Sequence, residues 1–453
     1  MLTLEGIQRA LEACVGPEQV LTAPAETALY RLGSVQPRFV VQASTVAQAA
    51  EVVALAGRER LALVPWGQGT QMHLGHSPQR YDLALVLRRL SRILEYDRAN
   101  LTLTAEAGVP LSEVYRLSVP QRQFLPLGQT ASSASLGGLL VTNTSGVKRW
   151  RYGGVRDLLL GVTVALPDGA VARFGGRVVK NVAGYDMNKL FIGSLGTFGV
   201  VLETTYRLAA WPEDDRLLLA AFPSVRQAVA AAQAVRASAL LPSALLLLPA
   251  EVITCWGVGP LSVATPQVLL GLNCDGLQAA VARQMQEAQA LCQRAGGETA
   301  AVLLGAALAA FWQVQEGWCQ TVEGGDPARL QVRLGTLPAS LEIMLGHLAR
   351  TPRFCPAPIA WLADAAQGQI WAHVPLPARC TEGDVLAVQH WLQEMREALP
   401  QQQGYVLLEY APLAWRPHLD VWGAPPGAAL LALYKQRFDP HAVLNPGRYV
   451  TGL

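Results

Sequence analysis

Three glycine-rich segments interrupt an otherwise apolar chain, and they constrain its fold more than any other feature. They are VPWGQGTQMHLG at 64–75, PLGQTASSASLGGLLVTNTSGVKRWRYGG at 126–154, and the stretch 180–205 that begins KNVAGYD. Because glycine has no Cβ, backbone N–H groups in such segments can approach phosphate oxygens closely. The first is neither a Walker A loop nor a G-x-G-x-x-G turn that opens a Rossmann helix. Taken singly, each also fits a plain structural role: a surface turn, a linker or a β-bulge, respectively.

Composition excludes several classes of protein. Hydrophobic residues make up 51% of the 453 residues and charged residues only 15%, which is the opposite of a disordered chain. The seven cysteines form no C-x-x-C pair, so we expect reduced thiols in place of a disulfide framework or metal site. The longest apolar stretch, 300–312, is too short to span a membrane, and the first residues lack a secretory pattern. We therefore expect a cytoplasmic globular protein with no transmembrane span.

The net charge of +2 argues against a nucleic-acid partner, but the charge is unevenly distributed. Residues 146–207 hold nine Lys or Arg and four Asp or Glu, so this window carries +5 and the remainder −3. Three of the four lysines, at 148, 180 and 189, lie within it. The cluster is either a solvated face or a local site for an anion such as a phosphate or carboxylate.

Periodicity divides the chain into two α+β parts. The early part predicts short strands, a helix from Ser44 or Thr45 to about Gly57, and a hairpin closed by a P-D-G turn at 167–169. After the Trp211-Pro212 break, strands and helices alternate and Gly, Ser and Thr become sparser. The predicted organisation is a helical lead-in (1–32), a glycine-rich domain (33–212), a second α+β domain (213–411) and a returning C-terminal segment (412–453).

In combination the three segments resemble the FAD-binding domain of the p-cresol methylhydroxylase/vanillyl-alcohol oxidase family. The motifs that carry the resemblance are P-W-G-Q-G-T (65–70), P-L-G-Q-T-x-S-S-A-S-L-G-G (126–138), T-N-T-S-G (142–146), R-Y-G-x-x-x-D (151–157), K-N-V-A-G-Y-D and G-S-L-G-T-F-G-V-V. They cover roughly residues 33–212. Within that family, G-R-V-V-K-N-V-A-G-Y-D and the terminal F-D-P-H-A-V-L-N-P-G-R are similar to the FAD-binding subunits of glycolate oxidases.

The resemblance implies a two-part FAD-binding domain followed by an antiparallel, ferredoxin-like cap domain. Histidine attaches FAD covalently in some members, but this chain has Thr70-Gln71 at that place, so non-covalent FAD is expected. The implied cofactor-binding residues are Pro65, Gly67, Gln68, Gly69, Thr70, Pro126, Gly128, Ser132, Ser135, Gly137, Gly138, Asn143, Ser145, Gly146, Gly196, Val201 and Asn445.

The second domain departs from related FAD-dependent 2-hydroxyacid dehydrogenases, which carry H-x-G-D-G-N-x-H and hold a metal. Here the matching region, 367–375, has one histidine, His373, so no metal site is expected and no catalytic residue is assigned. The resemblance implies a subunit that oxidises a small 2-hydroxyacid beside a catalytic flavin subunit and an iron–sulfur subunit, peripheral to the inner membrane face at most. A self-sufficient 2-hydroxyacid dehydrogenase and a scaffold that has lost FAD remain as alternatives.

Two local predictions concern the cofactor more directly. A short helix at 136–143 is expected to face the phosphates with its N-terminus. The tail at 439–449, DPHAVLNPGRY, contains two prolines and an Asn-Pro-Gly turn, which favour a fixed conformation over a frayed end. By resemblance, Asn445 should lie against the FAD-binding domain.

Overall fold

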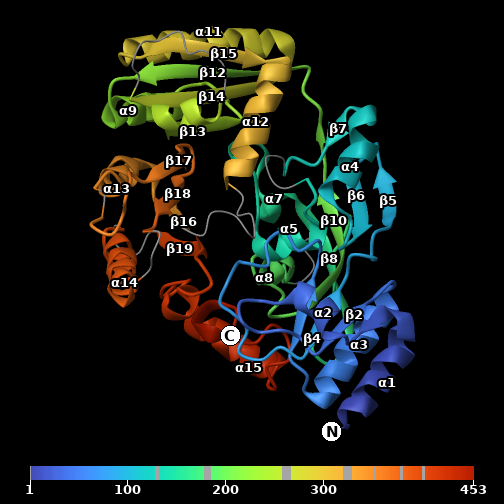
Figure 1. Cartoon of the computed structure of the whole chain (residues 1–453). Coiled ribbons are helices and arrows are strands. Elements are labelled where there is room, and N and C mark those ends of the chain that lie inside the picture. Colours follow the sequence, from blue (N-terminus) through green and yellow to red (C-terminus); the bar gives the residue numbers. More distant parts are fainter. Residues whose placement is uncertain are drawn as a thin grey trace. The chain divides into compact units, whose positions relative to one another are not determined.

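The computed structural model describes residues 2–127, 132–177, 185–257, 267–319, 329–350, 352–377, 381–399 and 404–453. The chain forms two compact units (Figure 1). Unit 1 contains residues 1–145, 154–210 and 424–453, and unit 2 contains residues 146–153 and 211–423. The chain therefore passes between the units four times, and the return to unit 1 begins at 424, later than the expected 412.

Unit 1 is built around two sheets (Figure 1). In the first sheet, β2 (Phe39–Gln42), β4 (Leu83–Val86) and β3 (Leu63–Trp66) are parallel, and β1 (Val20–Leu21) pairs antiparallel with β2. The second sheet is antiparallel, in the order β5 (Ile93–Asp97), β6 (Thr102–Glu106), β10 (Val200–Arg207), β8 (Leu159–Ala165), β9 (Val171–Gly175). A short pair joins β7 (Gln123–Phe124) to β11 (Ala209–Ala210). The helices are α1 (Leu4–Val15), α2 (Pro24–Thr27), α3 (Val46–Glu59), α4 (Leu111–Ser118), α5 (Leu136–Thr142), α7 (Val155–Leu158), α8 (Asn188–Phe191) and α15 (Ala428–Phe438).

Local chemistry explains where these elements begin and end. Thr45 caps α3 by accepting a hydrogen bond from the Gln48 amide, and Ser135 caps α5 in the same way through Gly138. The β8–β9 hairpin turns through Gly169 at φ +84°, as the P-D-G sequence predicted. Apolar side chains of α1, α3 and the first sheet form one core, and those of α5, α7 and the second sheet form another.

Unit 2 contains one eight-stranded antiparallel sheet in the order β15-β12-β14-β13-β17-β18-β16-β19. Its strands are β12 (Asp214–Phe222), β13 (Ala244–Pro249), β14 (Val268–Gly276), β15 (Glu298–Leu304), β16 (Arg329–Gly335), β17 (Ala360–Asp364), β18 (Gln369–Pro375) and β19 (Tyr405–Tyr410). Its helices are α6 (Arg149–Tyr152), α9 (Val225–Arg236), α10 (Ala250–Cys255), α11 (Gln278–Arg294), α12 (Gly305–Cys319), α13 (Leu341–Leu348) and α14 (Glu382–Glu397).

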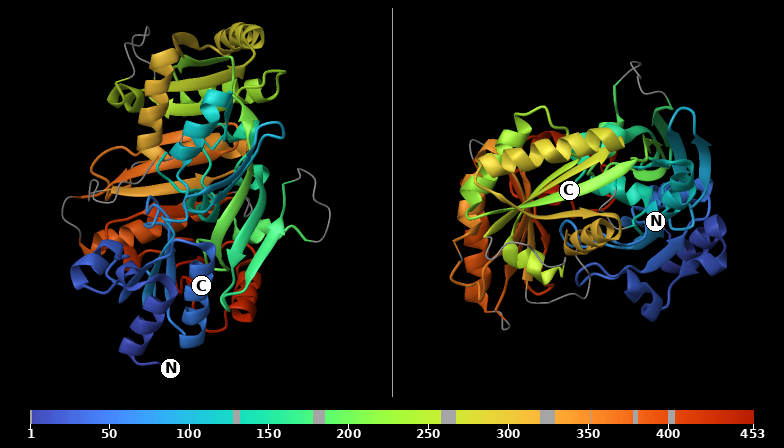
Figure 2. Two further views of the ribbon diagram at one scale, coloured as in Figure 1. Left: turned by 90° about the vertical axis from the view of Figure 1, so that its right-hand side faces the viewer. Right: turned by 90° about the horizontal axis from the view of Figure 1, so that it is seen from above.

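The sheet of unit 2 consists of two halves joined edge to edge at β13 and β17; both follow a β-α-β-β-α-β order, to which the first half adds α10 between β13 and β14. This order is the ferredoxin-like motif, which was expected from the resemblance. Helices α9, α11, α13 and α14 pack on one face, whereas α10 and α12 cover the other face of the first half (Figure 2). The two-part first unit and the antiparallel second unit confirm the predicted fold class.

Candidate functional site

The glycine-rich segments of unit 1 line one groove. It measures about 740 Å³ when the space open to solvent is included. Three stretches form it: the loop after β3, the start of α5, and the turn that precedes β10. The lining residues are Pro65, Trp66, Gly67, Gln68, Gly69, Thr70, Gln71, Met72, Leu87, Ala107, Ala134, Ser135, Gly137, Gly138, Leu139, Val141, Thr142, Leu195, Gly196, Val201 and Arg448.

The loop after β3 offers the groove a row of free amide donors. Among the described residues, no acceptor bonds to the backbone N–H groups of residues 67–71, and each of these residues is half-buried. A buried N–H group without a partner costs free energy, so such groups are normally satisfied by protein, water or ligand. Successive N–H groups in a turn can form an anion-binding nest, so these amides are candidates for binding the pyrophosphate of a dinucleotide.

Glycine at two positions of this loop is required for different reasons. A Cβ on Gly67 would lie 2.2 Å from Ser135 Oγ, so this glycine allows the loop to pack against the cap of α5. Gly69 adopts φ +83°, but a Cβ there would meet Trp66 only at an ordinary 3.4 Å. Gly67 therefore serves packing, whereas Gly69 serves the shape of the loop.

The start of α5 does not provide the free donors that its predicted role requires. The amides of Leu136 and Gly137 donate to the carbonyls of Val109 and Ala107 at 2.9 and 2.8 Å. The Gly138 amide donates to Ser135 Oγ at 3.2 Å. The predicted helix exists, but the protein itself already occupies these amides, so the amides of loop 67–71 are the better candidates for phosphate binding.

Side-chain contacts fix the groove loop to the end of α5. Thr144 Oγ1 donates to Gln71 Oε1 at 2.8 Å, and the hydroxyls of Thr142 and Thr144 lie 2.7 Å apart. Gln68 Nε2 donates to the Gly108 carbonyl at 3.1 Å. Both ends of the loop are therefore held by polar contacts while its amides remain without a described acceptor.

The C-terminal segment docks on the same loops. Asn445 is fully buried. Its backbone N–H donates to the Leu63 carbonyl at 2.7 Å, and its side-chain Nδ2 donates to the Leu195 carbonyl at 2.5 Å. Arg448 lines the groove, and its Nη2 donates to the carbonyls of Met72 and Leu74, both at 2.7 Å. The tail is therefore ordered, as its two prolines and Asn-Pro-Gly turn predicted.

Lys435 holds the helix before the tail. Its Nζ donates to the carbonyls of Thr197 and Leu444 and forms a 2.6 Å ion pair with Asp439. Burial lowers the pKa of this lysine, and the Asp439 carboxylate partly offsets that effect. One lysine thus ties the end of α15 both to the S-L-G-T-F-G turn and to the tail.

Ten of the seventeen residues predicted to bind the cofactor line the groove; Gly128 lies outside the described residues. Asn445 supports the groove through Leu195, Pro126 is buried elsewhere, and Ser132 is exposed. Asn143 ends α5 at φ +51°, Ser145 Oγ accepts from the Val155 amide, and Gly146 belongs to unit 2. The ten are Pro65, Gly67, Gln68, Gly69, Thr70, Ser135, Gly137, Gly138, Gly196 and Val201.

Sequence reasoning missed the groove residues that come from outside the motifs. Leu87 and Ala107 follow strands of the two sheets, and nothing local marks them as lining residues. Arg448 was part of the quoted tail motif but was not assigned a role. Its position next to Asn-Pro-Gly was the available signal.

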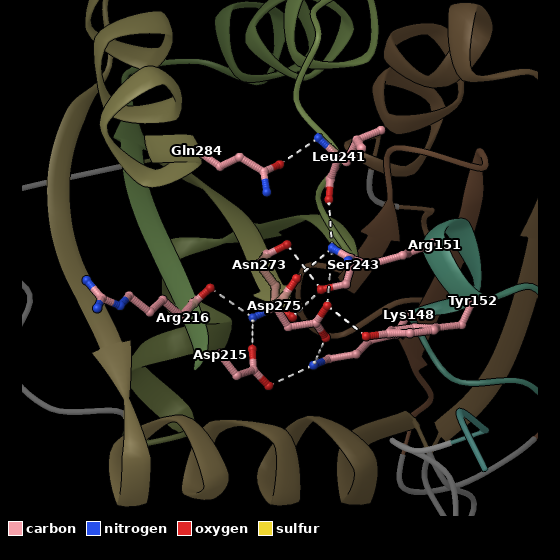
Figure 3. Close-up of polar contacts among 10 residues, drawn as sticks. All are labelled: Lys148, Arg151, Tyr152, Asp215, Arg216, Leu241, Ser243, Asn273, Asp275 and Gln284. Atoms are coloured by element: carbon pink, nitrogen blue, oxygen red, sulfur yellow. Dashed lines mark hydrogen bonds and ion pairs between the residues drawn. The ribbon is translucent and has the colours of Figure 1, made fainter. Parts of the chain in front are cut away.

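The described cations of the basic window 146–207 do not gather at one anion site, and Lys180 lies outside the described residues. Lys148 belongs to unit 2, where its Nζ binds Asp215 at 2.8 Å and Asp275 at 2.9 Å (Figure 3). Lys189 pairs with Asp186 at 2.9 Å, and Arg177 pairs with Glu95. Lys189 has a local partner, whereas Lys148 and Arg177 pair with carboxylates far away in the sequence, which sequence proximity could not reveal.

Residues 146–153 are anchored in unit 2 by a buried polar network (Figure 3). Asp275 accepts the Tyr152 hydroxyl at 2.9 Å, and its carbonyl accepts Arg151 Nη1 at 2.6 Å. Asn273 Nδ2 donates to Asp215 Oδ1 at 2.7 Å. The charges of Lys148 and Arg151 are matched by those of Asp215 and Asp275, so the network is a structural anchor whose cations already have carboxylate partners.

No group of three or more His, Cys, Asp or Glu side chains that could hold a metal occurs among the described residues. His373 lies on β18, 8% exposed, and stacks on Trp318 with ring centroids 4.0 Å apart. Burial, reinforced by the Arg329 charge, lowers the pKa of His373 to about 3, so its imidazole is neutral at ordinary pH. His347 and His390 lie on α13 and α14, respectively.

Two family models match the chain. One describes an FAD binding domain and matches residues 37–175; the other describes the C-terminal domain of FAD linked oxidases and matches residues 211–327. No helix of the described residues is long and apolar enough to cross a membrane.

Curated relatives carry three different names. The glycolate oxidase subunit GlcD of Bacillus subtilis (strain 168) is 30% identical over 57% of this chain and 56% of that protein. A D-2-hydroxyglutarate dehydrogenase of Xanthomonas citri pv. viticola is 27% identical over 97% of this chain and 96% of that protein. A D-lactate dehydrogenase of Anaerostipes hadrus is 28% identical over 50% of this chain and 48% of that protein. The chain thus spans about half the length of two of these relatives and nearly all of the third.

Solved structures share the fold at low sequence identity. An alkyldihydroxyacetonephosphate synthase superposes with a TM-score of 0.76 at 16% identity, over 99% of this chain and 86% of that one. A p-cresol methylhydroxylase superposes with a TM-score of 0.76 at 15% identity, over 98% of this chain and 96% of that one. These two likenesses support the fold alone.

Proposed function

Because this chain belongs to the FAD-linked oxidoreductases, we propose that it is the FAD-binding subunit of a complex that oxidises glycolate or a related small 2-hydroxyacid. One observation carries the substrate class. Glycolate, D-2-hydroxyglutarate and D-lactate, which appear in the relatives' names, are all 2-hydroxycarboxylates. The subunit role rests on the name of the Bacillus relative and on the sequence resemblance.

The groove of unit 1 fits the FAD pyrophosphate. The free amides of residues 67–71 would hold the phosphate oxygens, and Gly69 gives the loop the conformation that presents them. Arg448 fixes the far end of the loop through the Met72 and Leu74 carbonyls, so the donors are preorganised before the cofactor arrives. Bound FAD supplies a two-electron acceptor for oxidation of the hydroxyl-bearing carbon.

FAD should be held without a covalent bond, because Thr70 and Gln71 stand where covalent relatives carry histidine. Acid precipitation of the purified protein is therefore expected to release all flavin into the supernatant. Yellow colour retained in a washed pellet would contradict this expectation. Riboflavin added to an apoprotein sample and removed by the same procedure controls for flavin that is merely trapped.

A self-sufficient 2-hydroxyacid dehydrogenase is the second candidate. The observation that favours it is the full-length match to a D-2-hydroxyglutarate dehydrogenase, which covers 97% of this chain. The opposing observation is that the described residues of unit 2 contain no metal-binding cluster.

One experiment separates the two candidates. The purified chain is mixed anaerobically with glycolate, D-lactate or D-2-hydroxyglutarate, and flavin absorbance is followed with and without a dye acceptor. For a subunit that depends on partners, we expect flavin absorbance to persist with the chain alone and to bleach once partner subunits are added. Rapid bleaching with the chain alone would overturn the subunit assignment. A colourless protein that does not bind added FAD would favour the scaffold alternative.

A further inference from the structure

Helix α15 exposes most of its large apolar side chains and buries a lysine, while Leu431 packs against the core of the second sheet. Its one buried side chain is Lys435, whereas Leu430, Leu433, Tyr434 and Phe438 are between 37% and 63% exposed. A surface helix normally turns its apolar stripe toward the core. The burial of Lys435 has a local cause, because its Nζ donates to the carbonyls of Thr197 and Leu444.

The four exposed apolar side chains form one continuous stripe. Their positions, i, i+3, i+4 and i+8, place them on one side of the helix. The rings of Tyr434 and Phe438 are stacked, with centroids 5.8 Å apart and planes 11° apart, so this part of the stripe has a fixed shape. Apolar residues that gather on a surface mark interaction sites, whereas scattered single ones do not.

The C-terminal end of the stripe carries positive charge. Arg437 on α15 is exposed, and the exposed Arg80 side chain donates to the carbonyls of His441 and Ala442, just beyond the helix. Between residues 421 and 453, Asp439 is the one acidic residue, and it is buried in the ion pair with Lys435. Arg437 is thus the one exposed Lys or Arg of this segment, and no exposed carboxylate side chain accompanies it.

We propose that the stripe of Leu430, Leu433, Tyr434 and Phe438 docks a partner subunit whose apolar surface is bordered by Asp or Glu carboxylates. This inference rests on the proposed function, in which the chain works beside other subunits. A cationic border attracts an acidic one and steers association. Aromatic side chains flanked by arginine are the composition that interface centres favour.

Two other occupants fit the same stripe less well. In a dimer with a two-fold axis, identical patches face each other, which would bring the Arg437 and Arg80 charges of one copy toward those of the other. A helix that lies in a membrane surface is usually rich in Lys and Arg on its polar face, but α15 has one exposed cation. A different chain with acidic residues therefore matches the observations best.

The test uses the full chain co-produced with the catalytic flavin subunit and the iron–sulfur subunit of its own organism. The wild-type chain should co-elute with one or both of them. The double variant Leu430→Glu/Leu433→Glu should weaken this association by at least about tenfold, because it places charge in the centre of the contact. Leu4→Glu/Leu29→Glu is the matched control, since both residues are exposed leucines of unit 1 outside the stripe, and it should associate like the wild type.

Charge reversal tests the acidic border separately. Arg437→Glu should weaken the association and remove part of its dependence on ionic strength. An association unchanged by Arg437→Glu would overturn the acidic border. In every variant, the flavin-to-protein ratio and circular dichroism should match the wild type, which shows that Lys435 still holds the tail.

Each remaining outcome overturns the proposal in a recognisable way. A Leu430→Glu/Leu433→Glu variant that co-elutes like the wild type would place the contact elsewhere on the chain. A wild-type dimer that dissociates in this variant would identify a second copy as the occupant. Variant-sensitive flotation of the wild type with phosphatidylglycerol/phosphatidylethanolamine vesicles would identify a membrane. A wild-type chain that is loaded with FAD but binds neither subunit would refute both the docking surface and the subunit role, while leaving the FAD-linked oxidoreductase assignment intact.

Discussion

The groove of unit 1 and the polar network of unit 2 differ in whether their polar groups have partners. In the network, Lys148 has two carboxylate partners, and both carboxyl oxygens of Asp275 are bonded. In the groove, five successive amides have no acceptor among the described residues. Both regions are rich in donors, and sequence alone suggested an anion site in both. The difference teaches that a ligand site is recognised by donors that the protein leaves unused.

The largest expected effect comes from breaking the network. Lys148→Met leaves Asp215 and Asp275 without their shared cation, so we expect unfolding free energy to fall by about 3–5 kcal/mol. Urea unfolding followed by circular dichroism measures the change. Arg283→Met, which removes an exposed ion pair with Glu287, should change stability little. Equal, small effects in both variants would show that the network is not an anchor.

Unlike the carboxylates of the network, the carboxyl group of Asp364 in unit 2 has one oxygen without a partner among the described residues, and its titration can be tested. Asp364 is fully buried; its Oδ1 accepts from the Ala366 and Gln367 amides, but its Oδ2 has no partner. Burial raises the pKa of Asp364 to about 7. The folded protein therefore binds a proton that the unfolded chain releases near pH 4, so stability should fall as pH rises from about 4 to 7.

The loss of stability is roughly 4 kcal/mol for a pKa shift of that extent. Asp364→Asn keeps an oxygen for the two amides but cannot ionise, so its stability should not fall over that pH range on this account. Urea unfolding at pH 5 and pH 8, wild type against Asp364→Asn, measures the difference. Identical pH profiles of the two proteins would show that Asp364 does not titrate in this range.

The groove can be tested at Arg448, which holds the end of its loop. Arg448→Met removes the two hydrogen bonds to the Met72 and Leu74 carbonyls, which should cost about 2–3 kcal/mol of stability and lower FAD affinity. Thermal unfolding and FAD titration measure the two effects. Arg116→Met, which affects an exposed pair with Glu113, is the control and should leave FAD affinity unchanged. Deletion of residues 439–453 should weaken FAD retention more than Arg448→Met does.

The smallest loss of stability is expected for Gly69→Ala, and it should affect FAD binding more than folding. Gly69→Ala forces a Cβ onto φ +83° without a steric clash, so we expect a cost of about 1–2 kcal/mol, expressed mainly as weaker FAD binding. Gly67→Ala would place its Cβ 2.2 Å from Ser135 Oγ and should destabilise the fold itself. Loss of FAD binding and of stability in equal proportion in both variants would contradict the division of roles in the loop.

Local sequence predicted the features whose causes are local. The P-D-G hairpin at 167–169, the Thr45-capped helix and the ordered Asn445 turn follow from turn chemistry and capping. The glycine motifs identified most of the groove because they are contiguous and their chemistry is that of the backbone. These predictions required no knowledge of distant partners.

Features that depend on distant partners could not be predicted. Residues 146–153 lie between two segments of unit 1, yet Lys148 is held by carboxylates 67 and 127 residues later in the chain. Arg448 lines the groove because it reaches carbonyls some 375 residues earlier. For a similar reason, sequence could not show that Val109 and Ala107 supply acceptors for the first two amides of α5, whose phosphate role stays a prediction.

The central claim is that the free amides of residues 67–71 hold the FAD pyrophosphate. Calorimetric titration of flavin-depleted protein with FAD and with riboflavin tests it most directly, because riboflavin has the ring system without phosphate. The account predicts that FAD binds at least about 100-fold more tightly than riboflavin, and that Gly69→Ala weakens the binding of FAD but not of riboflavin. Equal affinity for the two ligands, or an equal loss of both in Gly69→Ala, would contradict it.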